Sequence, residues 1–291
     1  MNAALTYTKN NLRAVLLILV ALALVIAAMA IFLPPGVDWQ YGFRPAVFQF
    51  LAGRSPYDVV PSAAGTPQAI SIFNAPWMLI PLIPIALLPV KIGRAVLVMV
   101  SLISLGYVAF RMGARPLAIG LLLVSPPVVH GLLTGNVDWL AVLGFIMPPQ
   151  IGLFFIAIKP QVGIAVGVFW LVEAWRQGGW RSVLKTFGPF TAVLLVSMLL
   201  YGAWPLRFGQ QAGLQSASLW PMSIPVGLGL LAAALQKRKI KFAMAASPCL
   251  SPYLMMHSWV VALLAVSESL PVTAAAVVGF WILIAIRGFG G

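Results

Sequence analysis

Long apolar segments alternate with short clusters of lysine and arginine along almost the whole chain. The first of these segments, 14–33, follows Lys9 and Arg13, and the last ends near Arg287. About 20 apolar residues are enough to cross a bilayer as a helix. With 62% hydrophobic and 8% charged residues, the composition is far from that of a soluble domain, so we expect an integral membrane protein.

The number and breakage of the apolar segments predict the fold class. Strand-like alternation is weak, which argues against an outer-membrane barrel. We therefore expect an all-α, polytopic transmembrane helical bundle of about ten apolar segments, forming a single integral membrane domain over residues 1–291. Several segments between 117 and 175 are short and interrupted by proline or glycine, and broken helices of this kind often line a cavity. We expect a pocket there.

The basic clusters predict the orientation of the chain. Lysine and arginine gather on the cytoplasmic side of membrane proteins, so the N-terminal cluster, Lys91, Arg94 and the run 237–241 are expected to be cytoplasmic. The segment after that run is expected to cross to an outer loop at Glu268, whereas the basic loop 111–115 fits neither side well. This pattern predicts a multi-pass protein of the cell inner (plasma) membrane with both termini cytoplasmic. It also accounts for the net charge of +13 without a nucleic-acid partner.

The first loop, 36–70, is expected to be extracytoplasmic and carries two of the five acidic residues of the chain. Within it, Phe43, Val47, Phe50 and Leu51 recur at helical spacing. This spacing predicts a short interfacial helix in the first extracytoplasmic loop, with its aromatic face in contact with the membrane.

A few ionisable residues lie inside apolar segments, where a charge is costly and usually functional. They are Asp138, Lys159 and His257, with His130 as a weaker member. The structural alternatives are a buried ion pair between Asp138 and Lys159 and a histidine that only fills space. Both alternatives stay open at this point.

The common catalytic signatures are missing. The chain has one cysteine and two widely separated histidines, and it contains no HExxH, GxSxG or phosphate-binding loop. We therefore expect no metal and no cofactor. An ion-coupled transporter should show acidic relays or inverted repeats, and neither is present.

Five blocks resemble the pattern of glycosyltransferase family 87, the polyprenol-phosphate-mannose-dependent mannosyltransferase-like members of the GT-C superfamily. In chain order they are "VDWQYGFRPAVFQFLAGRSPYDV", "FNAPWMLIPLIPIALLP", "GNVDWLAVL", "IKPQ" and "SPYLMMHSWVVALL". The similarity spans about residues 36–266. It implies a GT-C-like fold.

The resemblance implies a glycosyltransferase that moves a hexose, with mannose expected, from a polyprenyl-phosphate-linked donor to a lipid or glycan acceptor outside the cytoplasm. Asp38 is then the catalytic base of an inverting, metal-independent transfer. One base suffices, because the departing phosphate needs no proton. The expected substrate-binding residues, of which the cations would neutralise the phosphate, are Tyr41, Arg44, Asn136, Asp138, Lys159, Gln161 and His257.

Two other functions remain open from the sequence. The chain is an accessory subunit of a membrane complex if it is catalytically silent, and this hypothesis predicts a filled site. It is a lipid or small-solute transporter if a passage reaches both faces. The enzyme hypothesis requires Asp38 to face a cavity that contains cations.

Overall fold

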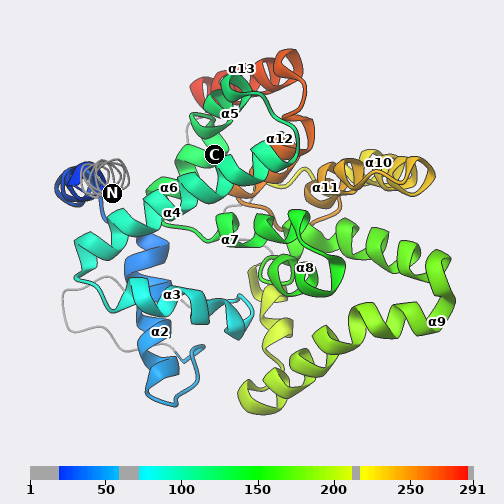
Figure 1. Cartoon of the computed structure of the whole chain (residues 1–291), viewed down its shortest axis with the longest axis horizontal. Coiled ribbons are helices and arrows are strands. Elements are labelled where there is room, and N and C mark those ends of the chain that lie inside the picture. The colour runs from blue at the N-terminus through cyan, green and yellow to red at the C-terminus, as the bar shows by residue number, and fades with distance from the viewer. Residues whose placement is uncertain (1–19, 59–71, 212–216, 288–291) are drawn as a thin grey trace, which may run out of the picture.

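The computed structural model describes residues 20–58, 72–211 and 217–287, and these form helices joined by turns, without a strand among them (Figure 1). An apolar helix, Val20–Phe32, comes first. The elements that follow are η1 (Asp38–Phe43), α2 (Arg44–Leu51), η2 (Pro76–Met78), α3 (Leu79–Ala86), α4 (Val90–Arg111), α5 (Pro116–Leu123), α6 (Pro126–Thr134), α7 (Asp138–Leu143), η3 (Gly144–Ile146), α8 (Pro149–Ile156), α9 (Pro160–Tyr201), η4 (Trp204–Gln211), α10 (Ile224–Lys237), α11 (Ile240–Cys249), η5 (Met256–Trp259), α12 (Val260–Val266) and α13 (Leu270–Arg287).

Only two of the described helices, α4 and α9, are long and apolar enough to cross a membrane. A third span is possible if α5 and α6, which meet at a 52° bend, are counted as one. The all-helical expectation agrees with the structure, but the GT-C-like bundle of about ten membrane-spanning segments is wrong. Proline and glycine divide most apolar segments into helices of 6 to 18 residues that pack on each other. Two membrane-length helices are compatible with a membrane protein.

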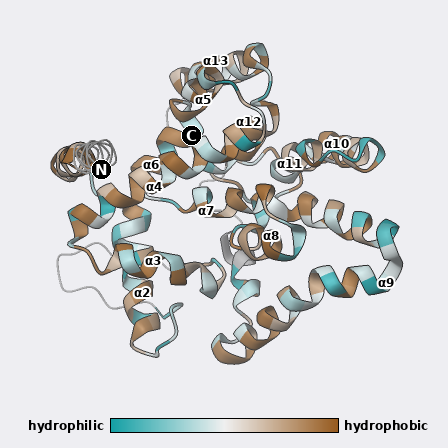
Figure 2. Cartoon of the chain, viewed as in Figure 1, coloured by the Kyte–Doolittle hydropathy of each residue, from teal (hydrophilic) through white to brown (hydrophobic). Residues whose placement is uncertain are grey.

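Helix α9 is bent back on itself near its middle. Gly178 and Gly179 leave the helical conformation there, and Gly179 takes a positive φ of 59°. Figure 1 shows the two legs of α9 as a wide V, and Figure 2 shows hydrophilic residues gathered at its turn. Glycine is the residue that adopts a positive φ at little cost. Basic residues flank the break on both sides, as Arg176 and Arg181.

One end of the molecule collects charged groups from three separate segments. Arg176 donates to the carbonyl of Leu235 at 2.7 Å, and Arg238 lies 2.5 Å from Glu173. Lys241, three residues after Arg238, donates to the carbonyl of Met112 and forms an ion pair with Glu268. We call the part of the molecule that contains these contacts the basic end.

These contacts correct the expected membrane topology in the last third of the chain. Lys241 and Glu268 are paired, so the segment between them begins and ends at one place. Helices α11 and α12 run out from the basic end and back again, packed against each other. This segment is therefore not a single crossing. The contact of Lys241 with Met112 also brings the loop 111–115, which fitted neither side, to the basic end.

The first third of the chain also turns back. Arg44 donates to the carbonyl of Ala86 at 3.1 Å, and the hydroxyl of Tyr57 donates to the carbonyl of Asn74 at 2.8 Å. Helices α2 and α3 therefore run in opposite directions as a pair, which brings Arg94 to the same end as the start of α2. The expectation that Arg94 and the first loop lie on opposite faces is wrong. Lys9, Arg13 and residues 59–71 lie outside the described residues.

A single buried hydrophobic cluster extends from Trp39 to Val277 and holds the elements together. The short helix predicted in the first loop is present as α2, but its aromatic face is only partly free. Phe43 and Val47 are buried in this cluster, whereas Leu51 is exposed. The two buried side chains anchor α2 to protein.

Candidate functional site

Polar side chains from four distant segments meet in one chain of contacts, which we call the polar cluster. Its members are Asp38, Asn136, Asp138, Lys159 and His257. Except for Asp38 and Asn136, they are at least 95% buried. All five were expected to be site residues. Each is brought to the cluster by a local feature of its own segment.

Asn136 is the bridge of the polar cluster. Its amide nitrogen donates to Asp38 Oδ2 at 2.6 Å, and its Oδ1 accepts from Lys159 Nζ and from the backbone N–H of Val137. An ammonium group is only a donor and an ionised carboxylate only an acceptor, so these neighbours fix which way the amide points. Asn136 therefore connects Asp38 to the buried Lys159, so the position of the Asp38 carboxylate depends on that of the lysine.

Two glycines allow the segment of Asp38 to approach that of Asn136. Gly135 ends α6 with a φ of 77°, and a Cβ there would lie 2.7 Å from Trp39 Cβ. A Cβ on Gly36 would lie 2.5 Å from Arg94 Nε. A left-handed glycine is a common helix terminator. Here it also removes the side chain that would separate the two segments.

Lys159 and Asp138 form a buried ion pair. Their Nζ and Oδ1 atoms are 3.0 Å apart, and the two side chains are 4% and 7% exposed. The Lys-Pro sequence places Lys159 directly before α9, since the residue before a proline avoids the helical conformation and proline suits the first helical position. Asp138 opens α7, where a negative charge at a helix N-terminus is favourable. The structural alternative left open by the sequence, an Asp138–Lys159 pair, is what the structure contains.

His257 completes the polar cluster on the far side of Asp138. Its Nδ1 lies 2.5 Å from Asp138 Oδ2, and the hydroxyl of Ser258 is 3.2 Å from Oδ1 of the same carboxylate. The His130 ring stacks on the His257 ring, with 5.4 Å between their centres. A histidine held by a carboxylate through one ring nitrogen has its orientation and tautomer set by that contact.

Arg94 is a member of the site that sequence reasoning missed. Arg94 is 4% exposed, and its Nη2 donates to the carbonyls of Leu132 and Leu133. Nε and Nη1 have no hydrogen-bond acceptor among the described residues. Arginine at the end of an apolar segment usually marks a membrane boundary, so no sequence pattern placed Arg94 beside Asp38.

Tyr253 is a second missed member. Burial first, and then the negative charges of Asp38 and Asp138, raise the pKa of its hydroxyl to about 12. The hydroxyl is therefore neutral at physiological pH and available as a hydrogen-bond donor. The Ser-Pro-Tyr sequence that precedes His257 is the only sequence signal that pointed to this side chain.

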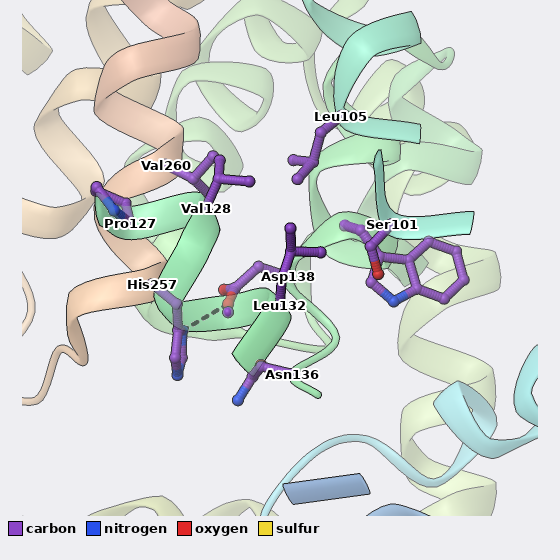
Figure 3. Close-up of a pocket in the computed structure, with 11 residues that line it drawn as sticks. Ser101, Leu105, Pro127, Val128, Leu132, Asn136, Asp138, His257 and Val260 are labelled. Atoms are coloured by element: carbon purple, nitrogen blue, oxygen red, sulfur yellow. Dashed lines mark ion pairs between the residues drawn. The ribbon is translucent and has the colours of Figure 1, made fainter. Parts of the chain in front are cut away.

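A small cavity lies beside the polar cluster (Figure 3). Its volume is about 20 Å³, and apolar side chains such as Leu105, Val128 and Val260 form most of its wall. Asp138, His257 and Asn136 face it from one side. A cavity needs roughly 10–15 Å³ to hold one water molecule. The cavity has room for water and is far too small for a sugar.

The remaining expected site residues are not brought to the polar cluster by any described contact. Arg44 lies over the Phe48 ring at 4.8 Å and donates to backbone carbonyls at the end of α3. Tyr41 accepts a hydrogen bond from Gln40 within η1. Gln161 is half-buried at the start of α9. Among the described residues no group of three or more histidine, cysteine, aspartate or glutamate side chains is placed to hold a metal ion.

Comparison of the chain with models of known families, with curated proteins and with solved structures gave no match. The resemblance to glycosyltransferase family 87 therefore stays a prediction from the five sequence blocks, and the polar cluster is interpreted from its own geometry.

Proposed function

We propose that this protein is a membrane glycosyltransferase that transfers a hexose from a polyprenyl-phosphate-linked donor to an acceptor hydroxyl, with Asp38 as the general base. The observation that carries the proposal is the state of Asp38. It is half-buried, Asn136 donates to its Oδ2, and its Oδ1 has no donor within the described part of the chain. A carboxylate that is held through one oxygen and open at the other is suited to accept a proton.

The charges around Asp38 suit a donor that carries a phosphodiester. Asp38 and Asp138 balance Lys159 and Arg94, so the charges of these four side chains cancel. A phosphodiester brings one negative charge and oxygen atoms that accept hydrogen bonds. Nε and Nη1 of Arg94 offer further donors that no described residue uses. Cations in a water-poor site stabilise a departing phosphate more strongly than they would in water.

The transfer that this site would support is a single displacement. Asp38 takes the proton of the acceptor hydroxyl while that oxygen attacks the anomeric carbon of the sugar, and the bond from this carbon to the phosphate oxygen breaks. The polyprenyl phosphate leaves with the bonding electrons. It needs no acid to protonate it, so a second carboxylic acid is not required.

One observation favours the accessory alternative. The cavity of about 20 Å³ beside the cluster has no room for a sugar, as expected for a site that no longer binds substrate. On the enzyme hypothesis the donor approaches Asp38 from its exposed side, and the buried ion pair also holds Asn136 and thereby Asp38. No feature of the site favours transport.

The test compares Asp38→Asn with Asp58→Asn, a matched change at an exposed aspartate in the same segment. Both variants are purified and supplied with polyprenyl-phosphate hexoses and a lipid acceptor. Transfer by Asp38→Asn should fall by about 10²- to 10⁴-fold, the range typical of a general base. Donor binding should persist, because the loss concerns the transition state. Near-normal transfer by Asp38→Asn would refute the assignment, and an unmodified protein that neither binds nor uses any donor would favour the accessory alternative.

A further inference from the structure

A larger pocket lies at the basic end, where the run 237–241 joins α10 to α11. Its volume is about 610 Å³, within the range of about 300–1,000 Å³ typical of ligand-binding pockets. Three cations line it, Arg238, Lys239 and Lys241, with Glu268 as the only acidic residue of its wall. The pocket has a positive balance of charge.

This pocket is separate from the polar cluster. It is lined by the start of α11 and by residues at the end of α12, including Val266. His257 precedes α12, so it lies at the other end of the same pair of helices. At 1.5 Å per residue, the ten residues of α11 alone span about 15 Å. The two pockets share no lining residue.

Two of the three cations are held in place by protein. Arg238 donates to Glu173 through both Nε and Nη2, and Lys241 is held by Glu268 and by the carbonyl of Met112. These pairs fix the positions of the positive groups before any ligand binds. A preorganised site loses less free energy on binding than one that has to order its side chains.

Lys239 differs from its two neighbours. It is exposed and forms no ion pair with any described residue. It sits at the turn into α11, directly after Arg238, whose φ of 53° is the one positive value of a non-glycine residue in the described chain. Backbone conformations of this kind are unfavourable for a side chain that has a Cβ and tend to occur at binding sites. The turn presents Lys239 to the pocket as an uncommitted cation.

The rest of the wall is apolar. Leu230, Phe242 and Val266 are among its residues, with Ala245 as a small residue that leaves space between them. A free phosphate or a nucleotide would leave this apolar surface exposed to water, whereas an acyl chain would cover it. Cations at one side and hydrocarbon at the other match a lipid that carries a phosphate.

We propose that this pocket binds an anionic phospholipid, with the lipid phosphate at Lys239, Arg238 and Lys241 and an acyl chain along Phe242 and its apolar neighbours. The location agrees with this occupant. Clusters of lysine and arginine attract anionic lipid headgroups, and the pocket lies where these residues gather. The bound lipid bridges α10, α11 and α12 at one point.

The experiment measures the thermal unfolding of the purified full chain in neutral detergent while lipid is titrated. Dioleoyl phosphatidylglycerol should raise the unfolding temperature in a saturable way, as a ligand of the folded state does. Dioleoyl phosphatidylcholine and inorganic phosphate should not. Lys239→Gln should weaken the apparent affinity for phosphatidylglycerol by about fivefold, as expected for one lysine at an anionic lipid. Lys185→Gln, an equal loss of charge at an exposed position outside the pocket, should leave it unchanged.

A second variant tests the apolar part of the pocket. Ala245→Phe narrows the apolar part of the pocket without changing any charge, and it should weaken the saturable stabilisation. The proposal is overturned if phosphatidylcholine stabilises as well as phosphatidylglycerol, or if Lys239→Gln and Lys185→Gln behave alike. Equal stabilisation by inorganic phosphate would assign the cations to a free anion instead. If Ala245→Phe does not fold, the comparison of Lys239→Gln with Lys185→Gln still decides.

Discussion

Replacing Lys159 by methionine should destabilise the protein by about 3 kcal/mol. The substitution keeps the length of the side chain and removes its charge, so Asp138 loses the ammonium group 3.0 Å away while 95% buried. Breaking a buried ion pair by removing one partner typically costs about 3–5 kcal/mol, because it leaves a charge without its partner. We place the loss at the lower end of that range because His257 and Ser258 remain in contact with the carboxylate.

The measurement is thermal unfolding in detergent, with an expected decrease of roughly 6–12 °C, since 1 kcal/mol corresponds to about 2–4 °C for a chain somewhat smaller than this one. Adding Asp138→Asn to Lys159→Met removes the isolated charge and should restore more than half of the loss. Lys185→Met, at an exposed position within α9, should stay within about 0.5 kcal/mol of the unmodified protein.

The reasoning would be refuted if Lys159→Met unfolded at the temperature of the unmodified protein. It would also fail if the double variant were less stable than Lys159→Met alone, because that result would mean that the cost comes from lost packing of the lysine stem. The comparison thus distinguishes the free-energy cost of losing the ion pair from that of losing the packing of the lysine stem.

Two other outcomes test the architecture. Gly135→Ala should destabilise the folded protein by about 2 kcal/mol or more, because it combines a φ of 77° with a Cβ 2.7 Å from Trp39. Gly120→Ala, whose Cβ would have no atom within 4 Å, should be neutral or slightly stabilising. Thermal unfolding compares the two variants. Cysteines placed at Lys239 and Ser269 should react alike with an impermeant thiol reagent in intact cells, since the pairing at the basic end puts both on one side, and labelling of only one of them would contradict the returning α11–α12 segment.

The sequence predicted the members of the polar cluster better than the path of the chain. Asp138, Lys159 and His257 stood out because charge inside apolar sequence is rare, and rare buried charges need each other. This argument does not depend on topology. The three residues were therefore expected to lie together even though the predicted number of membrane spans was wrong. It failed for Arg94, because an arginine beside the end of an apolar segment has the same sequence appearance at a membrane boundary as in a buried site.

The fold could not be predicted as well, because hydropathy reports removal from water and does not distinguish lipid from protein. The apolar run of α11 and the run of α12 have the composition of membrane segments, yet they return to their starting point. The cause is the interruption between them, at Ser251 and Pro252, where the chain turns back. Some interruptions only bend a helix, whereas others reverse the direction of the chain. Tertiary contacts such as that of Lys241 with Glu268 decide between the two.

The π-helix η1, Asp38–Phe43, sets the direction in which the Asp38 side chain points, and it does so independently of whether the segment folds. Its last turn is closed by a hydrogen bond from the N–H of Arg44 to the carbonyl of Trp39, one residue further back than in an α-helix. The loop therefore holds one residue more than a regular helix would. Deleting Gln40 would let the segment run into α2 as an ordinary helix while turning Asp38 by about 100° relative to the buried face of Phe43 and Val47. A single-codon deletion in this segment could thus leave a folded protein whose Asp38 no longer meets Asn136.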